Sequence, residues 1–147
     1  MILWRISEHA TLDGAGGLVV GGRWHSKGRP IVYAAESTAL AMLEVLVHLE
    51  VDSIPPPFQL MRIQVPDGLP HSAWPNSARS DLSSETAEWG DAWLARGDTA
   101  LARVPSAIAP DSFNWLINPL HSAARQIVTT AASRWPWDDR LFSGRPG

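Results

Sequence analysis

The chain has 147 residues, of which 45% are hydrophobic and 18% are charged, and its formal net charge is −3. This length predicts a single domain spanning residues 1–147, and the composition favours a packed core over disorder. The acidic balance and the scattered arginines argue against direct binding to nucleic acid, which requires clustered cations.

The chain contains no cysteine, which excludes disulfides and zinc sites built from thiolates. The first seven residues carry Arg5 and no long apolar run, so we expect no signal peptide. No stretch approaches the roughly 18 uncharged apolar residues that a membrane span requires. We therefore expect a soluble cytoplasmic protein without membrane contact.

In the first half of the chain, the pattern predicts two strands and one long helix. Residues 1–6 and 31–35 are short apolar strands, and they are separated by a glycine-rich loop over 9–22. Ser37 is suited to cap a helix over 38–49, which consists of strong helix formers. The triple proline at 55–57 ends this segment.

In the second half, a strand is predicted at 58–65, followed by a turn at 66–68. A second helix is predicted at 85–96, with Ser83 or Ser84 as its cap and Gly97 at its end. Short apolar segments lie at 100–105, 106–109 and 114–118. A β-branched strand is predicted at 125–132, and a turn-like tail begins at Trp135 and runs to residue 147. Because helices and strands do not alternate, we expect an α+β fold rather than a doubly wound α/β fold.

Tryptophan is unusually frequent, with eight copies against three Phe and one Tyr. Indole rings bury large areas, so we expect most of them to pack in the core or at its rim. The alternative is a binding module in which tryptophans stack on a sugar or a peptide.

Several common sites are excluded by their missing partners. Gly14-Ala15-Gly16-Gly17 is followed by neither Gly-Lys-Ser/Thr nor a helix pattern, so it predicts neither a phosphate loop nor a dinucleotide fingerprint. The five histidines form no close ligand pair, so we expect no metal. No Gly-x-Ser-x-Gly elbow is present.

Glu44 is the most informative residue, because it lies in the middle of the apolar helix predicted at 38–49. Its helical neighbours are Leu40, Ala41, Val47 and His48. A carboxylate is costly to bury unless it is paired or used, so one interpretation is an acidic group in a cleft. The other is a partly exposed glutamate paired with His48.

Three further residues are candidates for a site. Gly21 and Gly22 allow a sharp turn and close approach to a ligand, and Arg23 then offers a fork of donors suited to phosphate. Taken alone, this cluster favours a surface loop with a solvated arginine. Tyr33 is either a core residue or an aromatic platform for a flat heterocycle. Ser106 follows Pro105 and is weak evidence by itself.

Taken together, these residues resemble the RES domain family, which is named after an Arg, a Glu and a Ser. The resemblance spans nearly the whole chain in order, is strongest over residues 21–48 and is weak over 66–99. His25 stands where the family commonly has Asn. The matching stretches are Trp4-Arg5-Ile6, Gly21-Gly22-Arg23-Trp24, Val32-Tyr33-Ala34-Ala35-Glu36-Ser37, 41–48, Val104-Pro105-Ser106, Asn114, Asn118-Pro119-Leu120-His121 and Asp139-Arg140-Leu141-Phe142.

The resemblance implies an ADP-ribosyltransferase-like α+β fold with a central cleft, and NAD⁺ as the substrate without a metal. It assigns catalytic roles to Arg23, Tyr33, Glu44 and Ser106. Glu36 competes for the role of the glutamate but precedes the Ser37 cap. The residues expected to bind NAD⁺ are Arg5, Arg23, Lys27, Tyr33 and Asn118.

The resemblance also implies a toxin whose cleft is blocked by a cognate Xre-type antitoxin. We expect this toxin to cleave the nicotinamide–ribose bond, so that water or phosphate accepts ADP-ribose. The second hypothesis is a transferase that modifies a host protein with ADP-ribose, and the third is a non-catalytic Trp-rich binding module.

Overall fold

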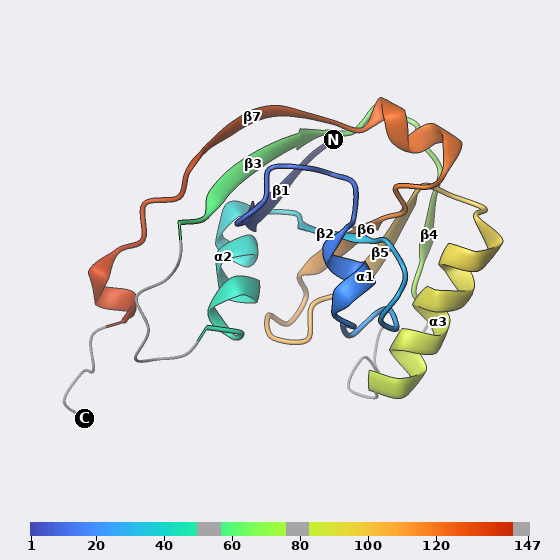
Figure 1. The fold of residues 1–147 in the computed structure, drawn as a ribbon, viewed down its shortest axis with the longest axis horizontal. Helices are drawn as coiled ribbons and strands as arrows, with labels where there is room; N and C mark the ends of the chain where they lie inside the picture. The colour runs from blue at the N-terminus through green and yellow to red at the C-terminus, as the bar shows by residue number, and fades with distance from the viewer. Residues whose placement is uncertain (50–56, 76–82, 143–147) are drawn as a thin grey trace.

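The computed structural model describes residues 1–49, 57–75 and 83–142, and within them it contains a mixed seven-stranded sheet in the order β4-β5-β6-β2-β1-β3-β7 (Figure 1). All strand pairs are antiparallel except β4 with β5. This arrangement confirms the predicted α+β class. The elements are β1 (Ile2–Ser7), α1 (Gly16–Val19), β2 (Val32–Ala35), α2 (Thr38–Leu46), β3 (Gln59–Gln64), β4 (His71–Ala73), α3 (Ser83–Arg96), β5 (Leu101–Pro105), β6 (Phe113–Ile117), η1 (Ser122–Gln126), β7 (Val128–Arg134) and η2 (Asp139–Leu141).

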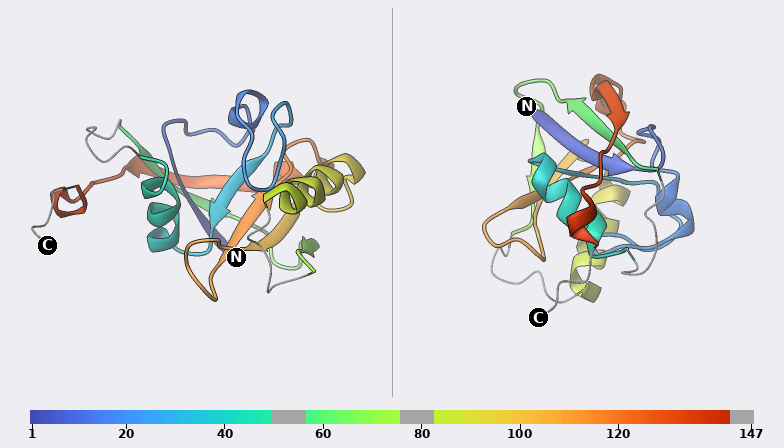
Figure 2. Two further views of the ribbon diagram at one scale, coloured as in Figure 1. Left: turned by 90° about the horizontal axis from the view of Figure 1, so that it is seen from below. Right: turned by 90° about the vertical axis from the view of Figure 1, so that its left-hand side faces the viewer.

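The sheet is nearly interrupted between β1 and β2, which pair through the single position Trp4 opposite Ala35. On one side of this junction lie β1, β3 and β7, and on the other lie β2, β6, β5 and β4 (Figures 1 and 2). Both sides contribute buried side chains to one core cluster, including Leu3 and Ile63 from the first and Val32 and Ile117 from the second. The two halves are therefore held together by packing more than by the hydrogen-bond ladder.

The two longer helices pack against separate clusters. Leu40 and Ala41 of α2 lie in a cluster with Ile6 and Ala35, and Trp93 of α3 lies in another with strands β5 and β6. The Ser37 side chain accepts a hydrogen bond from the Leu40 amide at 3.1 Å, which confirms the predicted cap of α2.

Helix α3 also anchors residues 20–31 between α1 and β2, which we call the glycine-rich loop from here on. The Thr86 hydroxyl donates to the Arg23 carbonyl at 2.6 Å, and the Asp91 carboxylate accepts from the amide and hydroxyl of Ser26 at 2.8 and 2.5 Å. Arg29 forms an ion pair with the same carboxylate at 3.4 Å. The loop is thus fixed from outside the sheet.

Several predicted boundaries were wrong. Helix α2 ends at Leu46 rather than at residue 49, because Val47 and His48 are exposed and no burial supports a further turn. The loop predicted at 9–22 contains the short helix α1, which the sequence pattern did not predict because glycine has a low helix propensity. Helix α3 begins at Ser83 rather than at residue 85, so Ser84 lies inside the helix and not at its N-cap.

Other differences lie in the second half of the chain. Strand β4 was missed, since it has three residues and pairs at an edge, whereas 106–109 contains no strand. Strand β7 begins at Val128 and not at residue 125, because η1 ends at Gln126, and the turn-like tail contains η2. Most of the proline stop predicted at 55–57 lies outside the described residues.

The tryptophans pack against one another, which confirms their structural interpretation. Trp24, Trp74 and Trp89 meet edge to face, with ring centroids 5.2 to 5.8 Å apart, and Trp93 is fully buried beside them. Among the residues that the structure describes, no helix has the length and apolar character to span a bilayer.

The closest packing between α3 and the loop is at Gly90, where an added Cβ would overlap the carbonyl of Trp24. We expect Gly90→Ala to lower the free energy of unfolding by about 2 kcal/mol, because the helix and the loop would have to separate. Urea denaturation measures this. Gly16→Ala is the control, since its Cβ meets no atom within 4 Å, and equal stability losses in both variants would contradict the packing argument.

Candidate active site

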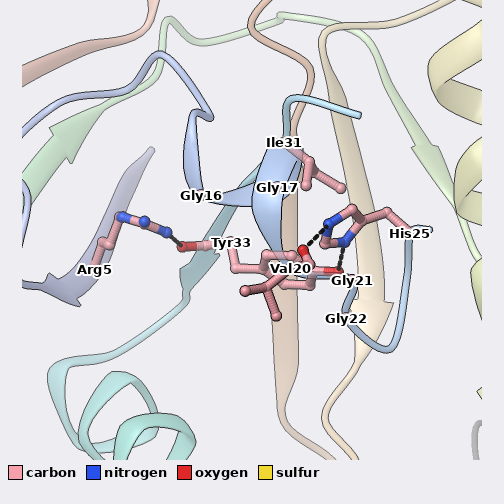
Figure 3. Close-up of a pocket in the computed structure, with 9 residues that line it drawn as sticks. All are labelled: Arg5, Gly16, Gly17, Val20, Gly21, Gly22, His25, Ile31 and Tyr33. Carbon is pink, nitrogen blue, oxygen red and sulfur yellow. Dashed lines mark hydrogen bonds between the residues drawn. The ribbon is translucent and has the colours of Figure 1, made fainter. Parts of the chain in front are cut away.

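A pocket of about 210 Å³ opens beside the junction of β1 and β2 (Figure 3). Its walls come from both strands, from α1 and from the glycine-rich loop. This volume suits one ring or phosphate group rather than a large ligand. The lining residues are Arg5, Gly16, Gly17, Val20, Gly21, Gly22, His25, Ile31 and Tyr33.

Two of the glycines are required by close approach. A Cβ on Gly22 would lie 2.7 Å from the Tyr33 hydroxyl and 3.2 Å from the His25 ring. A Cβ on Gly17 would meet the Arg29 carbonyl and lie 2.9 Å from the Ile31 side chain. A larger residue at Gly22 would push the loop away from Tyr33 of β2, and one at Gly17 would push α1 away from Arg29 and Ile31. These glycines therefore let α1 and the loop form a wall of the pocket.

Tyr33 is held by the loop through its hydroxyl group. The Trp24 amide donates to the hydroxyl oxygen at 3.2 Å, and His25 Nδ1 lies 2.7 Å from the same oxygen. Burial raises the pKa of Tyr33 well above its ordinary value, although the bond from the Trp24 amide opposes this shift. The side chain is therefore a neutral phenol near pH 7.

Arg5 spans the junction of the two strands. Since Trp4 pairs with Ala35, a continuous antiparallel ladder would place Ile6 opposite Tyr33. Instead, Nη1 of Arg5 donates to the main-chain carbonyl of Tyr33 at 2.9 Å (Figure 3). Burial lowers the pKa of Arg5, and the nearby Asp13 carboxylate raises it. An arginine stays charged after such a shift, so the pocket has a cationic wall.

The Arg5 guanidinium retains donor capacity. Its Nε is buried and has no hydrogen-bond partner among the described residues, and its Nη2 lies 3.5 Å from the Ser7 hydroxyl, a weak contact. A buried cationic donor without a partner is costly, which fits a site for an anionic group such as phosphate.

Glu44 forms a second group of polar residues with Ser106 and Asn114. Its Oε1 accepts from the Ser106 hydroxyl at 3.0 Å and from Asn114 Nδ2 at 2.6 Å. Within the described part of the chain, Oε2 accepts no hydrogen bond. The carboxylate is thus fixed through one oxygen and keeps the other available.

Ser106 is itself fixed by the turn that follows it. Its hydroxyl oxygen accepts from the amides of Ile108 and Ala109 at 3.2 and 3.1 Å, and its own amide donates to the Ser112 carbonyl at 2.9 Å. With both amides donating to its oxygen, the single hydrogen of the hydroxyl is directed to Glu44.

The two groups lie on the same face of the sheet. Ala35 on β2 is opposite Asn114 on β6, and Tyr33 lies two residues along β2 from Ala35. Alternate residues of a strand share a face, and two residues span roughly 7 Å. Glu44, held by Asn114, therefore lies a short distance along the sheet from the pocket that Tyr33 lines.

The structure brings together only part of the predicted set. Arg5 and Tyr33 line the pocket, and Glu44 and Ser106 bond each other. Arg23 does not line the pocket, and its charge only partly offsets the burial that raises the pKa of Tyr33. The other two predicted binding residues are Lys27, which is exposed, and Asn118, which is considered next.

Asn118 is buried and directly follows β6. Its amide donates to the Ala100 carbonyl at 2.9 Å, and its Oδ1 accepts from the Leu120 amide at 3.1 Å. These contacts give Asn118 a structural role in the turn, and Asn118 does not line the pocket. A role for Asn118 or Lys27 in binding remains a prediction.

The contacts of Glu44 and Glu36 decide between the interpretations that the sequence left open for these two residues. Glu44 is partly exposed, as the second interpretation expected, but its carboxylate accepts from Ser106 and Asn114, so the expected pairing with His48 was wrong. Glu36 is exposed and accepts from the Phe113 amide at 3.1 Å. Among described residues no cluster of three or more His, Cys, Asp or Glu could hold a metal.

Two residues of the site were missed by sequence reasoning. Asn114 was noted only as part of the resemblance, and no periodicity marks it as the partner of Glu44, 70 residues away. His25 was noted only as a departure from the common residue, although it directly follows the loop motif that carries Arg23.

Comparison with known proteins gives consistent matches. Residues 2–138 match the RES domain family. The chain is 46% identical to "Toxin Res" of Pseudomonas putida, over 97% of this chain and 100% of that protein. It is 39% identical to "Prs ADP-ribosylating toxin" of a Sphingobium species, over 95% of both chains.

A solved structure supports the fold. A chain of the M. tuberculosis MbcT–MbcA toxin–antitoxin complex superposes with a TM-score of 0.72, covering 91% of this chain and 83% of that one. The sequence identity is 18%, so this likeness concerns the architecture alone.

Removing the Ser106 hydroxyl should loosen both Glu44 and the turn at 106–109. We expect Ser106→Ala to lower the free energy of unfolding by about 1–2 kcal/mol, because two partly buried amides lose their acceptor. Urea denaturation measures this, and Ser112→Ala, at the other end of the same loop, is the matched control. Unchanged stability in Ser106→Ala would show that the turn does not depend on the hydroxyl.

Proposed function

The chain belongs to the RES domain family, and from this premise we propose that it is the toxin of a toxin–antitoxin system and cleaves the nicotinamide–ribose bond of NAD⁺. The observation that carries the proposal is the arrangement of Glu44. One carboxylate oxygen is held by two donors, the other is available, and the group shares a sheet face with Tyr33 at a cationic pocket.

The main requirement for cleavage of this bond is a negative charge held close to the ribose. The bond between the ribose C1′ and the ring nitrogen breaks, and nicotinamide leaves with the electron pair as a neutral molecule. Positive charge then develops on the ribose carbon and ring oxygen. The available oxygen of Glu44, near C1′ or bonded to a ribose hydroxyl, stabilises that charge in the transition state.

The remaining residues bind and orient the substrate. Arg5, whose Nε has no partner among the described residues, is suited to the diphosphate, and Arg23, which does not line the pocket, is the second candidate cation. Tyr33 offers an aromatic face to the nicotinamide ring. Ser106 and Asn114 act through Glu44 by fixing its orientation, and Lys27 and Asn118 would contribute from outside the pocket.

Water or phosphate can complete the reaction by attacking C1′ and losing a proton, which yields ADP-ribose or its phosphate. A protein side chain can do the same. The relative named "Prs ADP-ribosylating toxin" favours this second candidate, in which the chain transfers ADP-ribose to a host protein. The two candidates share the bond-breaking step and differ only in the acceptor.

The expected partner is an antitoxin. The solved neighbour is a toxin–antitoxin complex, which supports such a partner, and we propose that an Xre-type antitoxin blocks the pocket. A toxin that draws on the cell's NAD⁺ would act in the cytoplasm. The Trp-rich binding module has little support, since Trp24, Trp74, Trp89 and Trp93 pack on one another.

The first test is nicotinamide release from NAD⁺ by the purified protein and by Glu44→Gln. Glutamine keeps an oxygen that can accept from Ser106 and Asn114 but removes the negative charge, so we expect release to fall at least about 100-fold without loss of fold. Glu36→Gln is the matched control and should release nicotinamide at nearly the wild-type rate. The proposal fails if Glu44→Gln remains active, or if the folded wild type releases nothing even with cell extract added.

A second experiment separates the acceptors. With NAD⁺ labelled in the adenylate part and added cell extract, cleavage by water or phosphate should leave all label in small molecules. Label attached to one extract protein, and absent with Glu44→Gln, would establish the transferase instead.

A further inference from the structure

His25 is a buried polar residue of the pocket wall that the proposed reaction does not use. Its exposed fraction is 4%, and both ring nitrogens have partners (Figure 3). Nε2 lies 2.9 Å from the Val20 carbonyl, and Nδ1 lies 2.7 Å from the Tyr33 hydroxyl. The ring therefore connects the end of α1 to β2 across the pocket wall.

The two contacts determine where the hydrogens lie. A carbonyl oxygen can only accept, so Nε2 carries the hydrogen that is donated to Val20. In the neutral ring Nδ1 is then an acceptor, so the Tyr33 hydroxyl donates to it. The Trp24 amide donates to the same phenol oxygen, which leaves one lone pair of that oxygen unused.

We propose that His25 is a positioning residue that holds the Tyr33 hydroxyl with its hydrogen turned away from the substrate. Toward the pocket, the phenol oxygen can then only accept. This inference rests on the proposed function, in which Tyr33 contacts NAD⁺.

The orientation selects which part of the substrate lies beside Tyr33. A group that donates, such as a ribose hydroxyl or the carboxamide N–H of nicotinamide, can bond the phenol oxygen. A phosphate oxygen can only accept and would face another acceptor there, so the diphosphate is directed to Arg5. His25 thereby selects which single group of the dinucleotide enters the pocket beside Tyr33.

Two replacements separate this role from simple packing. The Oδ1 of an asparagine takes the position of the imidazole Nδ1 and can accept from the Tyr33 hydroxyl, whereas its shorter side chain does not reach the Val20 carbonyl. Leucine fills a similar volume but leaves the hydroxyl of Tyr33 and the carbonyl of Val20 without their partner.

Kinetics of nicotinamide release test the role in the reaction. We expect His25→Leu to lower kcat/KM for NAD⁺ about tenfold and His25→Asn to remain within about threefold of wild type. In a Tyr33→Phe background, His25→Leu should have less than about a twofold further effect, since the residue acts through the hydroxyl. His48→Leu and His48→Asn are the matched controls, because His48 is exposed.

Equal losses in His25→Leu and His25→Asn, or independent effects of the changes at 25 and 33, would overturn the proposal. Thermal melts of all variants identify losses that come from unfolding.

A measurement without turnover tests the contact itself. In the wild-type protein labelled with ¹⁵N-histidine, the signals that vanish in His25→Asn identify His25. We expect the neutral ring with hydrogen on Nε2, and a shifted Nδ1 signal in Tyr33→Phe. Hydrogen on Nδ1 would overturn the proposal even if the enzyme is active, whereas the expected tautomer in a protein that releases no nicotinamide would locate the failure in the proposed function.

Discussion

The site depends on an incomplete strand pairing. Strands β1 and β2 meet at Trp4 and Ala35 and then separate, and the guanidinium of Arg5 takes the place of the next ladder bond by donating to the Tyr33 carbonyl. This one substitution of a side chain for a backbone amide opens the sheet without leaving the carbonyl unpaired. It also puts a desolvated cation at the bottom of the opening, next to the only tyrosine of the chain.

Around that opening, different contacts fix each side chain of the candidate site. The glycine-rich loop lies against Tyr33 because Gly22 has no Cβ, and α3 holds the loop through Thr86 and Asp91. Glu44 is carried by α2 and held by Ser106 and Asn114 at the start of β6. Segments from Arg5 to Asn114 thus contribute to one small region, and α3 supports it from outside the sheet.

The parts that sequence reasoning predicted are those governed by short-range rules. The Ser37 cap, the strand at β3 and the unusual position of Glu44 can all be deduced from neighbours within a few residues. The resemblance supplied Arg23, Tyr33 and Ser106, which no local pattern would have joined. Helix α1 and strand β4 were missed because a single turn and a three-residue edge strand are stabilised by packing and pairing rather than by propensity. Asn114 and His25 could not be predicted, since each is defined by a partner that only the folded chain brings near.

The near-absence of a ladder between β1 and β2 makes the width of the site a property of the core. Because packing, and not hydrogen bonding, sets the angle between the two halves of the sheet, the cluster that includes Leu3, Ile63 and Ile117 acts as a spacer. Protein interiors are dense and transmit changes in volume, so a methyl group added or removed there alters the gap between Arg5 and Tyr33. The shape of the pocket therefore depends on apolar residues that do not line it, so substitutions in the core change the pocket without touching its walls.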